Sequence, residues 1–401
     1  MSSLVNAKND FPLFSERKDA FHYLDSASTT QKPQAVILAV AEAYKRFCAN
    51  PHRGAYRLSE DVTAKVASCR ESLRRFFNVP DSHEVIFTHG ATDALNALVF
   101  MMTPFLEAGD NVIVSPLEHH ANLLPWYRQQ KNIGTLVSTI STEDKFEVTL
   151  SDIERSITPS TKIISVTHVS NVLGTILPIK EITQIAKEKN IRVFVDGSQA
   201  AANLPVSIKN LGCDAYIVSA HKMYGPSGVG ALIIDKALAE TFEPYQLGGG
   251  MVLDVKDGEM IFAPLPERLE AGTLPIEGII GWQAAIEYLS SFKKEEKEKH
   301  LRNLRSKAWE ALSKIKGLTL FGSKDGIGAF SFAVEGVHSH DMATILDGNS
   351  VCVRAGHHCA KPLMGILGIE SLARVSFGIY NDESDIEALV KGIVQAQRIL
   401  L

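Results

Sequence analysis

Short apolar, β-branched runs alternate with segments of helical periodicity between about residues 85 and 235 of the chain. The apolar runs have the length and composition of strands and lie at residues 84–88, 111–115, 161–169, 191–196, 215–220 and 231–235. The segments with helical periodicity lie between them, at residues 92–106, 120–132 and 178–190. Alternation of this kind predicts an α/β unit built on a mostly parallel, buried sheet.

The pattern changes after this unit. Residues 241–281 are rich in glycine and proline, which predicts a loop with a short hairpin that reaches over a sheet edge or to a neighbouring subunit. A long amphipathic helix is predicted over about residues 277–315. The short strands and helices that follow, over residues 318–399, predict a smaller α+β domain.

Composition limits the classes of function. The chain has 401 residues, of which 45% are hydrophobic and 22% charged, as in ordinary globular proteins. Its 41 basic and 46 acidic residues include no clustered basic run, so we expect no nucleic acid partner. It has no signal-peptide pattern and no apolar stretch long enough for a bilayer, so we expect no membrane association. Five scattered cysteines are typical of free thiols in a reducing compartment, which predicts a cytoplasmic protein.

Three polar residues lie at the end of a predicted strand or just after it, at the sheet edge where open α/β sheets bind ligands: Lys222, Asp196 and His119. Taken alone, they have ordinary interpretations as a surface lysine, a helix cap or ion pair, and a loop histidine. Together they meet the needs of a pyridine cofactor, namely a lysine for a Schiff base, an acid for the ring nitrogen and a flat group over the ring. Gly90-Ala91-Thr92 opens a predicted helix whose N–H groups and dipole would favour a phosphate.

The chain carries, in this order, the motifs YLDSAST, EHHAN, SNVLGT, VDGSQA, SAHKMYGP, EAGT and RAGHHCA. It thereby resembles the group II cysteine desulfurases (the SufS and CsdA type), class V aminotransferase relatives among the fold-type I pyridoxal phosphate enzymes. The resemblance implies a large cofactor-binding α/β domain at 21–275 with a seven-stranded, mostly parallel sheet. It also implies a smaller α+β domain at 276–401 that carries the catalytic cysteine, and an N-terminal arm at 1–20 that packs on the small domain.

The resemblance also implies roles for residues at matching positions. Lys222 would bind pyridoxal 5'-phosphate as a Schiff base, Asp196 would keep its ring nitrogen protonated, and His119 would stack on the ring and assist proton transfer. Gln199 would hydrogen-bond the phenolic oxygen. The remaining cofactor contacts, mostly to the phosphate, would come from Ala91, Thr92, Ser219, His221 and Asn171, with Thr273 supplied by the other subunit of a homodimer.

The substrate carboxylate would be held by Arg374, helped by Asn171 and with Arg354 nearby, because a guanidinium fork matches a carboxylate. Two positions depart from the family. Relatives commonly carry threonine at the position of Ala91, which leaves only a backbone contact here. Leu274-Pro275 replaces the frequent Pro-Asn after EAGT, which bears on the loop geometry at the subunit boundary.

Residues 354–360, RAGHHCA, allow four interpretations: a zinc site, half of a disulfide, an inert thiol or a nucleophile. Adjacent His-His-Cys side chains cannot easily reach one metal, so we expect no metal site. The inferred compartment disfavours a disulfide between Cys352 and Cys359. A buried, inert thiol fits the cysteines in helix or strand patterns, which are Cys48, Cys69, Cys213 and Cys352. Cys359 lies in a break after Gly356, where a neighbouring cation would favour the nucleophilic thiolate.

The resemblance therefore implies conversion of L-cysteine to L-alanine, with Lys222 removing the α-proton and Cys359 keeping the sulfur as a persulfide. An acceptor protein of the SufE or CsdE type would receive this sulfur for iron–sulfur cluster assembly or related sulfur metabolism. A selenocysteine lyase that takes L-selenocysteine in the same site is the first alternative. A cofactor-free sulfur-carrier protein is the alternative from another class. Kynureninases and class V aminotransferases share the scaffold but do not explain a cysteine in this loop.

Overall fold

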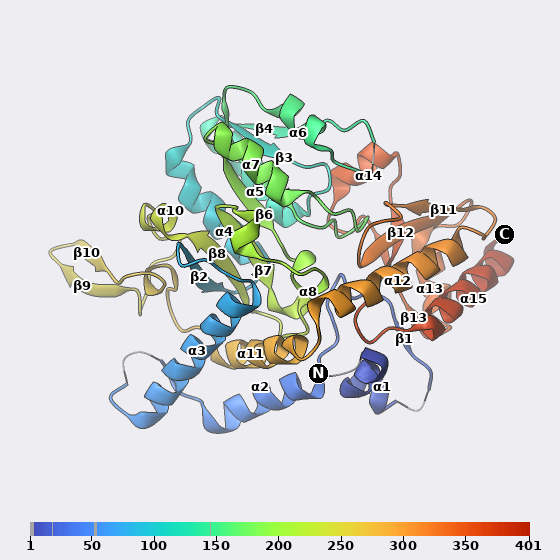
Figure 1. The fold of residues 1–401 in the computed structure, drawn as a ribbon, viewed down its shortest axis with the longest axis horizontal. Helices are drawn as coiled ribbons and strands as arrows, with labels where there is room; N and C mark the ends of the chain where they lie inside the picture. The colour runs from blue at the N-terminus through green and yellow to red at the C-terminus, as the bar shows by residue number, and fades with distance from the viewer. Residues whose placement is uncertain (1–3, 18, 52–53, 145) are drawn as a thin grey trace.

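The computed structural model describes residues 4–17, 19–51, 54–144 and 146–401. A central sheet of seven strands forms the larger part of the molecule (Figure 1). Its order is β2 (His83–Thr88), β8 (Gly230–Asp235), β7 (Ala215–Ser219), β6 (Arg192–Asp196), β5 (Thr161–Thr167), β3 (Asn111–Val114) and β4 (Leu136–Thr139). Only β8 runs antiparallel to its neighbours. The expected fold class, with a seven-stranded and mostly parallel sheet, is confirmed, and β4 is the strand that the hydrophobic pattern did not predict.

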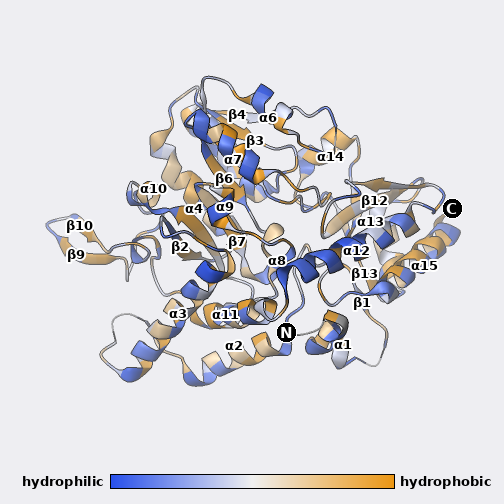
Figure 2. Cartoon of the chain, viewed as in Figure 1, coloured by the Kyte–Doolittle hydropathy of each residue, from blue (hydrophilic) through white to orange (hydrophobic). Residues whose placement is uncertain are grey.

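Side chains of each strand alternate between the two faces of this sheet. In β6, Phe194 joins the apolar cluster on one face, whereas Val193 and Val195 join the cluster on the other. The first cluster is covered by α4 (Ala91–Met102), α5 (Leu124–Ile133) and α10 (Lys236–Glu240). The second is covered by α3 (Arg57–Phe76), α7 (Ile179–Glu188) and α11 (Ile276–Ser290). Figure 2 shows the apolar residues concentrated along the central strands. The sheet is therefore buried on both faces, as its near-continuous apolar strands require.

The helix α2 (Gln34–Arg46) packs against α11. The remaining helices of this part are short, namely α6 (Leu150–Ser156), α8 (Ala200–Asn203) and α9 (Ile208–Leu211). The predicted hairpin is present as β9 (Val252–Lys256) and β10 (Glu259–Phe262), and it projects from the rest of the ribbon in Figure 1.

A four-stranded antiparallel sheet forms the core of the C-terminal part. Its order is β11 (Leu318–Phe321), β12 (Ala329–Val334), β15 (Leu372–Ser376) and β14 (Arg354–Gly356). Its helices are α12 (Lys294–Leu312), α13 (Ser339–Asp347), α14 (Lys361–Leu367) and α15 (Glu383–Leu400). The expected small α+β unit is therefore present.

The N-terminal segment contacts this C-terminal part through both backbone pairing and side-chain packing. The strand β1 (His22–Tyr23) pairs with β13 (Val351–Cys352). The ring of Phe11, just before α1 (Pro12–Ser15), lies 4.9 Å from that of Tyr380 and 5.8 Å from that of Tyr288. The domain limits at residues 20 and 275 stay predictions.

The prediction of one long amphipathic helix over 277–315 is wrong, because α11 ends at Ser290 and α12 begins at Lys294. The ring of Phe292, in the break, is buried and packs 5.2 Å from Tyr288, and Lys293 is extended. Tertiary packing of Phe292 therefore interrupts a sequence whose helical periodicity continues. Throughout the described ranges, every helix is too short or too polar to span a membrane.

Candidate active site

A cavity of about 360 Å³ opens at the carboxyl edge of the large sheet. The strands β2, β3, β5, β6 and β7 all end at this edge, because they run in the same direction. Most of the site residues predicted from the sequence line this cavity, namely Ala91, Thr92, His119, Asn171, Asp196, Ser219, His221, Lys222, Arg354, Cys359 and Arg374. Residues up to 283 positions apart in the chain thus meet in one place, as the rule for open α/β sheets predicts.

Lys222 and Asp196 supply opposite charges to this cavity. Lys222 ends the short 3-10 turn Ala220–Lys222 that follows β7, and Asp196 is the last residue of β6. Burial lowers the pKa of Lys222, and the negative charge of Asp196 opposes that shift. Asp196 Oδ1 also accepts a hydrogen bond from the backbone N–H of Ser198 at 2.9 Å. Burial thus favours the neutral amine of Lys222, whereas the nearby carboxylate favours its charged form.

His119 presents a neutral imidazole. Its pKa is lowered to about 4, first by burial and then by the positive charge of Lys222. Its Nδ1 accepts a hydrogen bond from the backbone N–H of Ala121 at 3.1 Å, so the neutral ring carries its proton on Nε2. The result is a flat, uncharged ring in the cavity, of the kind that can lie against another aromatic ring.

The turn between β2 and α4 brings backbone close to the cavity. Gly90 has φ +129°, which glycine adopts without strain. A Cβ on the neighbouring Gly230 of β8 would lie 2.7 Å from the Cα of Gly90, so the two backbones pass each other more closely than any side chain would allow. The N-terminal turn of α4 can thereby present its N–H groups to an anion in the cavity.

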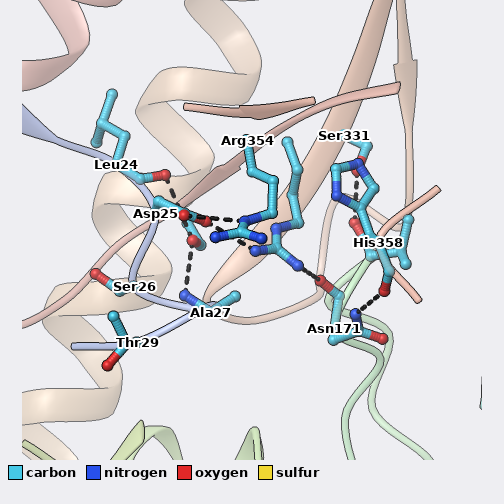
Figure 3. Close-up of polar contacts among 12 residues, drawn as sticks. Leu24, Asp25, Ser26, Ala27, Thr29, Asn171, Ser331, Arg354 and His358 are labelled. Atoms are coloured by element: carbon cyan, nitrogen blue, oxygen red, sulfur yellow. Dashed lines mark hydrogen bonds and ion pairs between the residues drawn. The ribbon is translucent and has the colours of Figure 1, made fainter. Parts of the chain in front are cut away.

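Asp25 pairs with both arginines of the cavity, an arrangement that the sequence did not reveal (Figure 3). Its Oδ1 accepts from Nη2 of Arg374 at 2.8 Å, and its Oδ2 accepts from Nε of Arg354 at 3.1 Å. Arg374 is buried and donates its Nη1 to the carbonyl of Asn171 at 3.0 Å. Because these contacts occupy one N–H of each Nη, a substrate carboxylate would have to use the other N–H groups of this guanidinium.

Three polar atoms in this region are buried without a hydrogen-bond partner in the part of the chain that the structure describes. They are Nε of Arg374, Oδ1 of Asn171 and Nδ1 of His358. The amide nitrogen of Asn171 is occupied, because it donates to the carbonyl of His358 at 2.8 Å (Figure 3). An unpaired donor and an unpaired acceptor at a cavity wall are suited to a polar ligand.

Cys359 lies in the same cavity, between β14 and α14, and its side chain is exposed. Two of the other cysteines are buried: burial raises the pKa of Cys213 to about 12 and raises that of Cys69 as well. Cys352 is half-buried, and burial raises its pKa too. The expectation that Cys48 is a buried thiol is wrong, because it is exposed just beyond the end of α2, where the helical pattern has stopped.

Two predicted site residues lie outside this cavity. Gln199 is buried, and its Nε2 donates to the carbonyl of Ala27 at 2.8 Å. Thr273 borders a separate groove together with Pro51 and Gly250. Among the described residues, no group of three or more His, Cys, Asp or Glu side chains could hold a metal ion.

Comparison with known proteins identifies the family to which the chain belongs. The model of the family "Aminotransferase class-V" matches residues 22–389. A protein of Halalkalibacterium halodurans named "Probable cysteine desulfurase" is 41% identical over 372 residues, which cover 92% of each sequence. The crystal structure of the cysteine desulfurase CsdA from Escherichia coli is similar with a TM-score of 0.93 and 33% identity over 100% of both chains.

The apo structure of the cysteine desulfurase from Thermococcus onnurineus NA1 is similar with a TM-score of 0.94 and 34% identity, over 100% of this chain and 98% of that one. The chain therefore belongs to the class V aminotransferase family and, within it, to the cysteine desulfurases. The resemblance that the motifs indicated is confirmed.

Proposed function

We propose that the protein is a pyridoxal phosphate-dependent cysteine desulfurase, which converts L-cysteine to L-alanine and retains the sulfur on Cys359 as a persulfide. One observation carries this proposal: an exposed cysteine lines the same cavity as the half-buried Lys222. An aminotransferase would have no use for that thiol, whereas a desulfurase requires it as the nucleophile.

The cavity fits pyridoxal phosphate by its donor set. Lys222 would hold the aldehyde carbon and Asp196 the ring nitrogen, while His119 would cover one face of the ring. The phosphate would lie at the N-terminus of α4, near Ala91, Thr92, Ser219 and His221, which all line the cavity. Bound there, the cofactor would supply an electron sink for the Cα of an amino acid.

The residues of this chain then have separate tasks. Arg374 orients the substrate carboxylate through its free N–H groups, with Asn171 beside it and Arg354 at the rim. The Nζ of Lys222 takes the α-proton, and its lowered pKa makes the neutral, basic amine more available. The Sγ of Cys359 attacks the substrate sulfur, so that a sulfur–sulfur bond forms while the bond from sulfur to the substrate Cβ breaks. Protonation of that carbon leaves alanine.

Other parts of the proposal concern assembly and pathway. Thr273 lies in a groove away from the cavity of its own chain, so we assign it to the phosphate site of the second subunit of a homodimer. The projecting hairpin β9–β10 exposes Leu253 and Val255, which a second subunit would cover. An acceptor protein of the SufE or CsdE type would take the sulfur for iron–sulfur cluster assembly or related sulfur metabolism. The five free cysteines of the desulfurase chain itself suit a cytoplasmic enzyme.

A selenocysteine lyase working in the same site is not favoured, because the relatives reported above are named cysteine desulfurases. A cofactor-free sulfur carrier would leave Lys222 and the buried Asp196 without a task. The ratio of kcat/KM for L-cysteine and L-selenocysteine would separate desulfurase from lyase.

The decisive experiment measures alanine and sulfide released from L-cysteine by the holoenzyme with a thiol reductant. Lys222→Ala and Cys359→Ala are each expected to lower sulfide release by several orders of magnitude. Cys48→Ala is the matched control, because it removes an exposed thiol outside the cavity and should keep the wild-type rate. Wild-type sulfide release by Cys359→Ala would refute the role of this cysteine.

A further inference from the structure

The backbone of the cysteine loop adopts an unusual conformation. His358 has φ +52° and Cys359 has φ +55°, so two consecutive residues with side chains lie in the left-handed region. Residues other than glycine are uncommon there, and such strain persists only where surrounding contacts enforce it. The contacts that enforce it decide where the thiol of Cys359 points.

His120 supplies two of these contacts from the other side of the cavity. Its backbone N–H donates to the carbonyl of Cys359 at 2.7 Å, and its ring Nε2 accepts from the backbone N–H of Lys361 at 3.1 Å. These two hydrogen bonds hold the backbone at Cys359 and two residues beyond it, at Lys361. Asn171 holds the other side through the carbonyl of His358. Within the loop, the N–H of Cys359 donates to Nδ1 of His357 at 3.1 Å.

We propose that His120 is a positioning residue, which holds the loop of Cys359 in the conformation that delivers the thiol to the substrate. The proposal rests on the proposed function, because it takes Cys359 to be the sulfur-accepting nucleophile. His120 itself touches neither the cofactor site nor the reacting atoms, and it does not line the cavity.

The structure gives His120 the protonation state that this task requires. Nε2 can accept the N–H of Lys361 only in a neutral ring that carries its proton on Nδ1. The pKa of His120 is lowered, first by burial and then by the ring of His357, whose centroid is 5.7 Å away. The acceptor is therefore available at neutral pH.

The turn that carries His120 is held in place by hydrogen bonds to the side chain of Glu118. This buried carboxyl accepts hydrogen bonds from the hydroxyl of Ser115, from the amide of Asn122 at 2.7 Å and from the backbone N–H of Thr167 at 2.8 Å. With Glu118 anchored in this way, His119 faces the cavity while the next residue contacts the cysteine loop. One turn thus links the ring-covering histidine to the position of the nucleophile.

The test compares His120→Ala with His120→Gln in the holoenzyme. The alanine variant loses the acceptor for Lys361, whereas the Oε1 of glutamine restores one. We expect His120→Ala to keep the cofactor absorption band and its response to L-cysteine, but to form persulfide on Cys359 about 10-fold to 100-fold more slowly. The glutamine variant should recover most of that rate. The alkylation rate of Cys359 by iodoacetamide, without substrate, should change in the alanine variant only.

His338→Ala is the matched control, because the exposed His338 also accepts a backbone N–H, that of His340 at 3.3 Å, but at the start of α13. It should behave as the wild type. A wild-type rate and alkylation profile in His120→Ala would overturn the proposal, and so would loss of its cofactor band, since that would assign His120 to the cofactor site. Failure of the proposed function would instead appear in the wild type, as an absence of sulfur on Cys359.

Discussion

At the scale of single residues, the carboxylate of Asp25 forms two ion pairs that differ in how far the arginine partner is exposed to solvent. Its partner Arg374 is almost completely buried, with 3% of its side chain exposed, whereas the side chain of Arg354 is 50% exposed. A buried guanidinium that loses its carboxylate pays its full desolvation cost, but an exposed one is solvated by water. The two pairs should therefore contribute very differently to stability.

We expect Asp25→Ala to lower the free energy of unfolding by about 3 kcal/mol, because it leaves the charge of Arg374 buried and uncompensated. The KM for L-cysteine should rise as well, since this guanidinium would lose its orientation. Denaturant unfolding and initial rates measure the two effects. Arg354→Ala, which breaks only the exposed pair, should cost less than about 1 kcal/mol. Equal losses in the two variants would contradict this account.

The residues that the sequence predicted share one property. Lys222, Asp196 and His119 each lie at the carboxyl end of a strand or within five residues of it, so the topology of a parallel sheet is enough to bring them together. Asp25 and His120 have no such signal. Their roles depend on contacts with residues more than 200 positions away in the chain, and no local pattern records those contacts. The acidic residue of YLDSAST and the second histidine of EHHAN were the only hints.

At the scale of elements, β8 and the turn before α4 touch through two glycines. A Cβ at Gly230 would lie 2.7 Å from both the Cα of Gly90 and the carbonyl oxygen of Val218, and neither atom can move without moving its strand or turn. The separation of these elements, and with it the place of the predicted phosphate site, depends on the missing side chain.

Gly230→Ala should therefore destabilise the protein and weaken retention of pyridoxal phosphate together. We expect a loss of about 1–3 kcal/mol, typical of overpacking, and release of the cofactor under dialysis that leaves the wild type saturated. Thermal unfolding and the absorption of the dialysed holoenzyme check these effects. Gly365→Ala in α14 is the control, because nothing lies within 4 Å of its added Cβ. A cofactor-saturated, wild-type-like Gly230→Ala would contradict the proposed close approach.

The elements themselves were largely predictable. Six of the seven strands of the large sheet were located by their apolar runs, because burial on both faces leaves a continuous signal. The strand β4 escaped because it lies at the sheet edge and its residues are only half-buried or exposed. The break between α11 and α12 escaped because only the packing of Phe292 marks it.

At the scale of the whole molecule, burial keeps several histidines neutral. The pKa is lowered to about 4 for His119, His168 and His221 and to about 3 for His358, in each case first by burial. A histidine with a folded-state pKa below its unfolded value of 6.5 binds fewer protons when folded. Its contribution to stability is complete above pH 6.5 and is lost as the pH falls toward about 4.

His168 isolates this effect, because it is buried outside the cavity and its Nδ1 pairs with the hydroxyl of Tyr216 at 2.9 Å. We expect the free energy of unfolding of the holoenzyme to fall between pH 6.5 and 4. His168→Gln should flatten that slope by roughly 1 kcal/mol per pH unit. Urea unfolding at several pH values measures it. Parallel slopes for the wild type and the variant would show that His168 does not titrate in this way.

The central claim is that sulfur leaves L-cysteine for Cys359. The most direct measurement treats the holoenzyme with L-cysteine in the absence of an acceptor, traps all thiols by alkylation and maps the peptides by mass spectrometry. The peptide that contains Cys359 should gain the mass of one sulfur atom, with one alanine formed for each sulfur added. Alanine formed in the same amount while this peptide stays unmodified would contradict the claim.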